Sequence, residues 1–531
     1  MFSIKSYKPK IYTFCAVIFL TLSHSLHAIH FGKPSLLGHF GNQIAGGLLV
    51  DARQKDSGLL SVQYEQTFTT NPYGITRLLF FNGSYVMRVS AAPRTTANTT
   101  DIYCTNFLIG TQTLGGLATT GFDSLLTFKP KIKTYSTYFG MHYNLGDVYN
   151  GLYAAWHIPF THLHWKANVR EIALAAPGRF IAGDISNNDI DTTINSSATS
   201  FLAGQATGGQ YNEPLRFGKF NDRISVSKIG NAKLKIGYSI IDHDTQSLAV
   251  EAHTLLNGNG PSTARNWFEP SVGTAGRFGL GAGLKFHQSL FRKNILEDGV
   301  EKPDYGIDFY LDAQLTHLFA RTCKRSYDVT RHGVGSRYML AKKKPALGTS
   351  FTTANNIVSV INYTTLDAKI NIDLLFDATA LFRYTNDGLK MDFGYQLTGQ
   401  TKENHKGWQG DISALIGMMR ISGTNFGGAD LDNVSTDIQI HGANAAGQTA
   451  NAVAFNTPGA TITRNDLNIE SGLHPCEISH TFLWNLEYGW KNVLTAMPVS
   501  PFVGVGTAYE TGGSNNALNQ WHFFINTGIS F

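Results

Sequence analysis

The chain has 531 residues, of which 15% are charged, 42% are hydrophobic and 54 are glycine. The charged share lies well below the quarter that is usual for soluble domains, whereas a sheet that shows one face to lipid has such a composition. Three of the 43 basic residues lie in the first 28 positions, so the rest of the chain is close to neutral. Without a clustered basic face, we expect no nucleic-acid partner.

The first 28 residues have the layout of an export signal peptide. Three lysines between positions 5 and 10 precede an apolar run at residues 11–22. This run is too short for a membrane-spanning helix, which needs about 20 residues. We predict a signal peptide over residues 1–28, cleaved near Ala28, and a mature domain over residues 29–531.

Alternation of apolar and polar residues with a period of two dominates the mature chain and indicates β-strands. The expected strands lie at about 44–52, 59–68, 77–89, 102–110, 131–144, 151–166, 234–240, 247–255, 278–286, 307–315, 366–376, 389–398, 408–419, 482–490, 499–510 and 521–531. These are roughly 16 segments, in a range of about 12 to 18, and their length suits tilted transmembrane strands of 9–11 residues. Because backbone polar groups in lipid must pair internally, spanning strands require a closed barrel.

Three long segments interrupt the alternation, at residues 167–222, 320–365 and 421–478. The first and the third are rich in Gly, Asn, Ala, Ser and Thr, a composition typical of surface loops. The predicted fold is therefore all-β, a transmembrane antiparallel up-and-down β-barrel with long loops.

The final strand ends on an aromatic residue. Its apolar face consists of Trp521, Phe523, Ile525, Ile529 and Phe531. A soluble chain usually frays at its end, whereas a terminal ring at a membrane rim can sit in the interface with its carboxylate in water. This strand resembles the C-terminal sorting strand of bacterial outer-membrane proteins. The resemblance implies a Gram-negative outer-membrane β-barrel in contact with outer-membrane lipid, recognised by the barrel-assembly machinery, with both termini in the periplasm; it indicates no subfamily.

Counting hairpins backwards from Phe531 places residues 421–478 outside, residues 400–407 in a periplasmic turn and the Asn386 turn outside. Segment 320–365 then falls on the periplasmic side, where long loops are unusual. Either one strand has not been recognised in the alternation, or segment 320–365 has an unusual structure for its side of the membrane. Between positions 321 and 344 it carries eight basic residues and one acid. It is either a solvated loop or a constriction or plug of the lumen, with the candidate residues Arg321, Lys324, Arg325, Arg331 and Arg337.

Catalytic chemistry finds no support in the sequence. There is no GxSxG, HExxH or phosphate-binding GxxxxGK[ST] motif. His162 and His164 share one strand face but have no carboxylate or thiolate partner in register. We therefore expect no enzymatic activity, no cofactor and no metal.

A barrel of about 16 strands leaves an aqueous channel, so we predict a porin-like channel for the passive diffusion of small hydrophilic solutes. The candidate pore-lining charges are Arg277, Lys285, Asp308, Asp312, Asp367, Lys369, Asp373, Lys390, Asp392, Asp411 and Glu487. Their acidic excess favours cations weakly, and a basic segment in the pore would reverse that preference.

Two other functions stay open. One is a surface adhesin or antigen that acts through the loops at 167–222 and 421–478. The other is a transporter of apolar ligands, for which residues 29–43 are too few to form a sizeable plug. The oligomeric state and the disulfide status of Cys104, Cys323 and Cys476 are not determined by the sequence.

Overall fold

A computed structural model of the chain gives the fold. It describes residues 57–79, 84–91, 101–103, 107, 109, 122–178, 197–205, 213–243, 245–258, 260–267, 269–297, 300–343, 357–412, 416–418, 462–490, 499–513 and 519–531. The predicted signal peptide, the expected strand at 44–52 and most of the loop at 421–478 lie outside these residues. Within them, no helix is long and apolar enough to cross a membrane.

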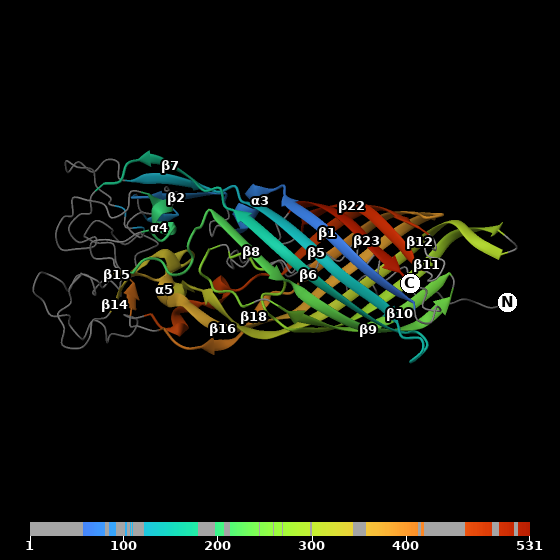
Figure 1. Ribbon diagram of the computed structural model, residues 1–531. Coiled ribbons are helices and arrows are strands. Elements are labelled where there is room, and N and C mark those ends of the chain that lie inside the picture. The colour runs from blue at the N-terminus through green and yellow to red at the C-terminus, as the bar shows by residue number, and fades with distance from the viewer. Residues whose placement is uncertain are drawn as a thin grey trace, which may run out of the picture.

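Twelve strands of the described chain close into one antiparallel barrel (Figure 1). In chain order they are β1 (Gly58–Thr69), β5 (Lys131–Asn144), β6 (Leu152–Lys166), β9 (Asn231–His243), β10 (Gln246–Asn257), β11 (Gly279–Glu297), β12 (Val300–Ser326), β16 (Thr365–Asn386), β17 (Leu389–Gln400), β21 (Glu477–Gly489), β22 (Ser500–Gly512) and β23 (Gln520–Ser530). Each strand pairs with its neighbour in this order, and β23 pairs with β1. The predicted fold class is therefore confirmed, with the strand number at the lower bound of the expected range.

The barrel presents apolar residues outward and polar residues inward. In β1, Leu60, Val62 and Tyr64 are exposed, whereas Gln63 and Glu65 are buried. In β23, Phe523, Ile525 and Ile529 are likewise exposed, and His522 and Asn526 are buried. An apolar exterior of this kind around a polar interior is the pattern of a barrel that stands in lipid.

The first and last strands close the barrel through the terminal residue. The N–H of Gly58 donates to the carbonyl of Phe531 at 2.7 Å, and the N–H of Phe531 donates back at 2.9 Å. The Phe531 ring lies so close to Gly58 that a Cβ there would be 2.5 Å from it. Because only glycine leaves room for the ring at this point, Gly58 and Phe531 are a matched pair at the seam.

The end of the barrel opposite to Gly58 and Phe531 carries a folded assembly, which we call the cap (Figure 1). Its described elements are α3 (Pro72–Leu79), β2 (Val86–Ser90), β3 (Ile102–Tyr103), β4 (Asp123–Thr127), β7 (Arg170–Ala175), α4 (Ala198–Leu202), β8 (Arg223–Ile229), β13 (Asp328–Val329), the 3-10 helices η3 (Thr330–His332) and η4 (Ser336–Tyr338), β14 (Leu340–Lys343), β15 (Ile357–Ser359), α5 (Ile361–Thr364), β18 (Glu403–Gln409), β19 (Ile416–Met418), η5 (Arg464–Asp466), β20 (Leu467–Asn468) and η6 (Ile469–Gly472). The described residues of the expected strands at 77–89, 102–110 and 408–419 belong to the cap, so they are no part of the barrel wall.

The cap has a hydrophobic core of its own. Trp267 stacks on Tyr338 with 4.9 Å between ring centroids, and Phe220 packs against Trp267 at 4.3 Å. A second stack joins Phe107 to Phe201 at 4.8 Å. These rings come from loops that are far apart in the sequence and are all buried. Their burial explains how such long loops form a folded body.

Strand β18 corrects the orientation of segment 320–365. It pairs with β16 beside residues 367–372, and it continues from β17 in the same direction, away from the chain ends. The expected periplasmic turn at 400–407 and the separate strand at 408–419 are therefore wrong. One strand was counted too many, so the Asn386 turn lies at the same end as the termini. Segment 320–365 lies at the cap end, where long loops belong.

Strands β12 and β16 reverse their faces where the barrel meets the cap. In the barrel part of β16, Asp377 and Arg383 point inward. At the cap end of the same strand, the buried residues are Ala368 and Ile370, which lie on the opposite face. The pairing of β12 with β16 is irregular between Thr316 and Arg321. An irregularity in one ladder bends a strand and re-aims its side chains, so the polar lumen gives way to an apolar interior in the cap.

The topology predicts opposite labelling of two exposed positions. Val148 lies in the turn between β5 and β6 at the terminal end, and Asp411 follows β18 at the cap end. In a variant whose native cysteines are replaced by serine, we expect Asp411→Cys to react with a membrane-impermeant maleimide on intact cells. Val148→Cys should react only after the outer membrane is permeabilised. Labelling of both positions on intact cells would contradict the topology.

Candidate functional site

The barrel lumen is filled by three clusters of charged side chains. The first surrounds Glu251 of β10. Its carboxylate accepts from Lys235 at 3.2 Å, from Lys285 at 2.8 Å and from the Tyr153 hydroxyl at 3.0 Å. These partners come from β9, β11 and β6, so one acid holds together side chains from four strands.

The second cluster holds a buried arginine. Arg383 forms two parallel bonds to Asp392, at 2.7 Å through Nε and 3.0 Å through Nη2. Asn485 donates to the same carboxylate at 2.9 Å. Beside it, Lys390 bonds Glu487 at 2.9 Å. The bidentate geometry is the strongest form of ion pair in proteins, and it fixes β16 against β17 from the inside.

The third cluster lies between the first strand and the last two. Nδ1 of His522 is 2.6 Å from a carboxylate oxygen of Glu65, and its Nε2 is 3.5 Å from Glu510. Gln520 donates to Glu510 at 2.6 Å. The seam of the barrel is therefore bonded by side chains inside as well as by the backbone.

Several bonds reach past neighbouring strands. Lys233 of β9 donates to Gln314 of β12 at 2.6 Å, although β10 and β11 lie between these two strands. Lys233, Arg383 and Asp392 are at most 2% exposed. A wide aqueous pore would leave inward charges open to water. These three side chains are therefore shielded from water by the lumen side chains around them.

Where the barrel meets the cap, two arginines share one acid. Nη2 of Arg277 lies 2.6 Å from Glu403, and Nη2 of Arg325 lies 3.0 Å from the same oxygen. The other oxygen of Glu403 accepts the backbone N–H of His474 at 3.0 Å. Glu403 belongs to β18, Arg325 to β12 and Arg277 to the approach to β11. This cluster, Arg277–Glu403–Arg325, closes the cap end of the lumen.

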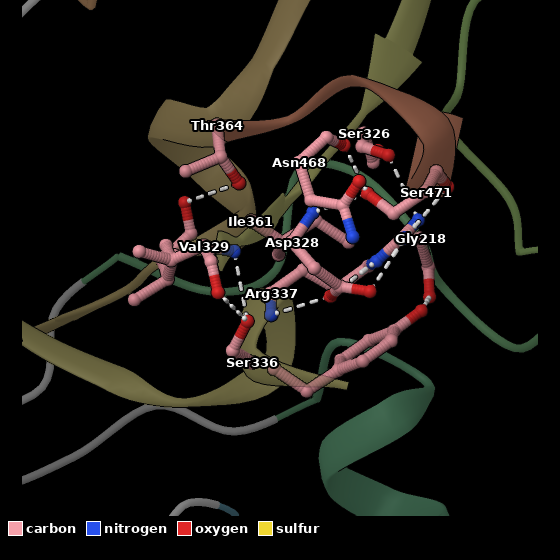
Figure 2. A network of polar contacts seen from close by, with 12 residues as sticks. Gly218, Ser326, Asp328, Val329, Ser336, Arg337, Ile361, Thr364, Asn468 and Ser471 are labelled. Atoms are coloured by element: carbon pink, nitrogen blue, oxygen red, sulfur yellow. Dashed lines mark hydrogen bonds and ion pairs between the residues drawn. The ribbon is translucent and has the colours of Figure 1, made fainter. Parts of the chain in front are cut away.

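Above it, a buried ion pair organises the cap (Figure 2). Arg337 donates to both oxygens of Asp328 at 2.8 and 2.9 Å and to the carbonyls of Ser326 and Ser471 at 2.8 Å each. Burial alone would raise the pKa of Asp328, but the Arg337 charge and its hydrogen bonds outweigh burial and lower that pKa below its usual 3.8. Asp328 therefore remains ionised at neutral pH.

Six of the predicted pore-lining charges line the described lumen. They are Lys285, Asp308, Asp312, Lys390, Asp392 and Glu487. Arg277 lies at the cap end of the lumen, bonded to Glu403.

Four predicted pore-lining residues lie elsewhere. Lys369 and Asp373 are exposed on the face of β16 that points away from the cap interior, and Asp367 on that face pairs with Lys324 at 2.9 Å. Asp411 follows β18 and pairs with Arg464 on the surface. Their placement in the lumen was wrong, because β16 reverses its face and because residues 408–419 are not a barrel strand. The acidic excess counted from the sequence therefore does not describe the lumen.

The basic segment does not form a periplasmic plug. The last six residues of β12, at the cap end, include Arg321, Lys324 and Arg325. Arg337 is buried in the cap. The backbone of Arg331 lies in η3, whereas its side chain is outside the described part of the chain. Arg321 donates to the carbonyl of Gly276. Among its described charges, Arg325 and Arg337 are buried in ion pairs with Glu403 and Asp328 and join the cap to the barrel, whereas Lys324 pairs with Asp367 at the surface.

Several lumen charges escaped the sequence reasoning: Glu65, Lys233, Lys235, Glu251, Asp377, Arg383 and Glu510. Most lie in the weaker alternating runs, in which inward charges were not tabulated. Arg383 lies beyond the expected end of its strand at residue 376. Extending each strand to the next turn signal would have found it, because Asn386-Asp387-Gly388 is the first such signal after it.

The described residues contain no group of three or more His, Cys, Asp or Glu side chains placed to hold a metal ion. His162 and His164, which share a face as predicted, each bond a serine of β8, at 2.7 Å to Ser227 and 2.8 Å to Ser225. They join β6 to β8.

No protein-family model and no curated protein sequence matches the chain. Among solved structures, it is similar to an outer-membrane channel from Pseudomonas putida F1, with a TM-score of 0.34 and 9% identity over 91% of this chain and 97% of that one. It is also similar to a Pseudomonas aeruginosa FadL homologue, with a TM-score of 0.28 and 9% identity over 93% and 97%. For the translocator domain of the autotransporter NalP from Neisseria meningitidis, the TM-score is 0.28 and the identity 8% over 94% and 95%.

These likenesses are too distant to carry function. The closed barrel, its apolar exterior and its polar lumen define the class on their own. The chain therefore has the architecture of an outer-membrane-type β-barrel.

The buried pair Arg383–Asp392 generates a stability prediction. We expect Arg383→Met to lower the free energy of unfolding by about 3–5 kcal/mol, because Asp392 is then buried without its cation. The double variant Arg383→Met with Asp392→Leu should recover much of this loss. Urea unfolding of the purified barrel, followed by electrophoretic heat modifiability, measures both. Equal losses in the single and double variants would contradict the assignment.

The pair Asp328–Arg337 predicts an acid-sensitive cap. Because folding lowers the pKa of Asp328, its contribution is complete above the unfolded value of 3.8 and is lost as the pH falls through the lower folded value. We expect hydrogen exchange at residues 326–340 to increase between pH 5 and pH 2.5. Asp328→Asn should show the increased exchange already at pH 5. The same protection at both pH values would contradict the role of this pair.

Proposed function

We propose that this protein is a Gram-negative outer-membrane channel for small hydrophilic solutes and that the described form is its closed state. The observation that carries the proposal is the lumen itself. Most of its inward side chains are charged or polar, as in the clusters around Glu251, Arg383 and His522, and one apolar group of Tyr310, Leu381, Leu483 and Ala508 lies among them. A polar path costs a hydrophilic solute little desolvation, whereas an apolar ligand would gain nothing from it.

Conduction requires the clusters to separate. Bonds such as Lys233–Gln314 and Tyr153–Glu251 join strands that are not neighbours, so they close the passage rather than only lining it. The bonds are between side chains of different strands, so rotamer changes of these side chains would open a path without moving the backbone. Selectivity would follow from the charges that remain along that path.

A surface adhesin or antigen is the second candidate. The cap favours it, because its aromatic core makes it a folded body at the end that faces outward if the termini are periplasmic. Deleting residues 421–478 distinguishes the two functions. An adhesin would lose surface binding and keep its conductance, whereas a channel with a structural cap would change its conductance.

The channel proposal predicts the behaviour of purified protein in a planar lipid bilayer. We expect the wild type to open rarely or with small conductance, and Arg383→Ala with Asp392→Ala to raise the mean conductance several-fold, because an ion pair that blocks the lumen is removed. Lys369→Ala, on the exposed face of β16, is the matched control and should behave as the wild type.

Two results would overturn the proposal. If neither the wild type nor the double variant conducts, the protein is no channel. If the wild type shows a large steady conductance that the variants leave unchanged, the lumen clusters do not close it.

A further inference from the structure

One side of the barrel carries a basic surface at the cap end. Strands β5, β6 and β8 run side by side there, and Lys131 of β5 lies opposite Lys166 of β6, which in turn lies opposite Arg223 of β8 (Figure 1). Lys133 points to the same side as Lys131, because side chains alternate along a strand. Lys166 is half-buried, and the other three are exposed. We call these four residues, Lys131, Lys133, Lys166 and Arg223, the basic rim.

The basic rim begins where the apolar exterior of this wall ends. In the barrel part of β5, Phe139 is exposed on the outside and Ser136 is buried on the inside. At the cap end of the same strand, Ile132 is buried in the core of the cap, and Lys131 and Lys133 face outward. An apolar outer face suits lipid, whereas a charged outer face over an apolar core suits water. The change of polarity therefore marks the edge of the lipid-facing belt.

The chain itself supplies the basic rim with little negative charge. Of its four residues, only Arg223 takes part in an ion pair of the described chain, at 3.9 Å to Asp222, and both of these side chains are more than half exposed. Asp147, the only acid between Lys131 and Lys166 in the sequence, lies in the turn at the other end of β5. Like charges directly opposite each other on neighbouring strands destabilise a sheet. The row formed by the two lysines and the arginine therefore favours an anion from outside the chain.

The spacing of the basic rim suits a phosphate group. Neighbouring strands lie about 5 Å apart, so the ammonium groups of Lys131 and Lys166 can both reach the oxygens of one phosphate. Phosphate oxygens accept short, charge-assisted hydrogen bonds from lysine and arginine. Two adjacent cations of the rim can thus hold one phosphate between them.

The surface on the barrel side of the basic rim suits acyl chains. Phe160 of β6 lies opposite Ile229 of β8, and both side chains are exposed. The Phe160 ring packs edge-on against Phe139 of β5, with 5.7 Å between the ring centroids. An apolar surface next to a row of cations matches a molecule with apolar chains and a negatively charged head. A free phosphate ion would leave this apolar surface without a partner.

We propose that the basic rim binds the phosphorylated headgroup of a membrane lipid whose acyl chains lie on the apolar exterior beside it. The proposal requires the barrel to stand in lipid and does not require it to conduct, so it goes beyond the channel function. Because the rim occupies β5, β6 and β8, the lipid is held at one side of the barrel.

Native mass spectrometry of the folded full-length protein in non-ionic detergent tests the proposal. The probes are dimyristoyl phosphatidic acid and dimyristoyl phosphatidylcholine, which share their acyl chains and differ in whether choline covers the phosphate. We expect the wild type to retain several-fold more phosphatidic acid than phosphatidylcholine. Lys131→Gln with Lys166→Gln should weaken the binding of phosphatidic acid about 10-fold, because each cation next to an anionic lipid surface adds to the attraction. Lys369→Gln with Lys406→Gln removes two exposed lysines of β16 and β18 and should bind as the wild type.

A second pair of rim variants keeps the test decisive if the first pair does not fold, and electrophoretic heat modifiability shows which variants are folded. Lys133→Gln with Arg223→Gln should also weaken the binding of phosphatidic acid. The proposal is overturned by equal retention of the two lipids, by wild-type retention of phosphatidic acid in a folded rim variant, by an equal loss in the control pair, or by displacement of phosphatidic acid by an equal concentration of inorganic phosphate. Because no current is measured, a barrel that does not conduct leaves the result unaffected.

Discussion

Backbone pairing of the first strand with the last is the constraint on which the molecule depends. In lipid an unpaired N–H or C=O has no water to bond, so a sheet can span a membrane only when it has no edge. The reciprocal bonds between Gly58 and Phe531 begin this seam, and the register of β1 with β23 continues it to Thr69. Once the seam is closed, the side chains of the twelve strands alternate between the lipid and the lumen, except where β12 and β16 continue into the cap.

The small strand number explains why the lumen is filled. A twelve-stranded barrel is narrow enough for long side chains to meet across intervening strands, as Lys233 and Gln314 do. Charges brought so close out of bulk water must be paired, because an isolated buried charge is costly. The pairing within the clusters around Glu251, Arg383 and His522 is therefore a consequence of barrel size.

The barrel could be predicted from the sequence and the cap could not. Each of the twelve spanning strands overlaps a segment that the alternation predicted, because lipid on one side and polar groups on the other impose a period of two, although several strands are much longer than expected. Alternation also occurs in the cap, where one face packs on a core of aromatic rings, so residues 77–89, 102–110 and 408–419 were taken for spanning strands. A period of two indicates that a strand has one apolar and one polar face, but it does not indicate whether the apolar face contacts lipid or a protein core. The spanning strand predicted at 408–419 was an error of this kind, and it placed segment 320–365 at the wrong end of the barrel.

The ion pairs of the lumen could not be predicted from the sequence for a related reason. Arg277 and Glu403 are separated by 126 positions, and Lys390 and Glu487 by 97. The order of the strands around the barrel and their register relative to one another decide which inward charges meet. Neither can be predicted from a short stretch of sequence. Residue types still constrain the result: arginines in segment 321–344 needed acids, and the cap supplies Asp328 from within the segment and Glu403 from β18. The described arginines of a basic segment at the mouth of a barrel are stable there because acids from the same segment and from a neighbouring strand lie beside them.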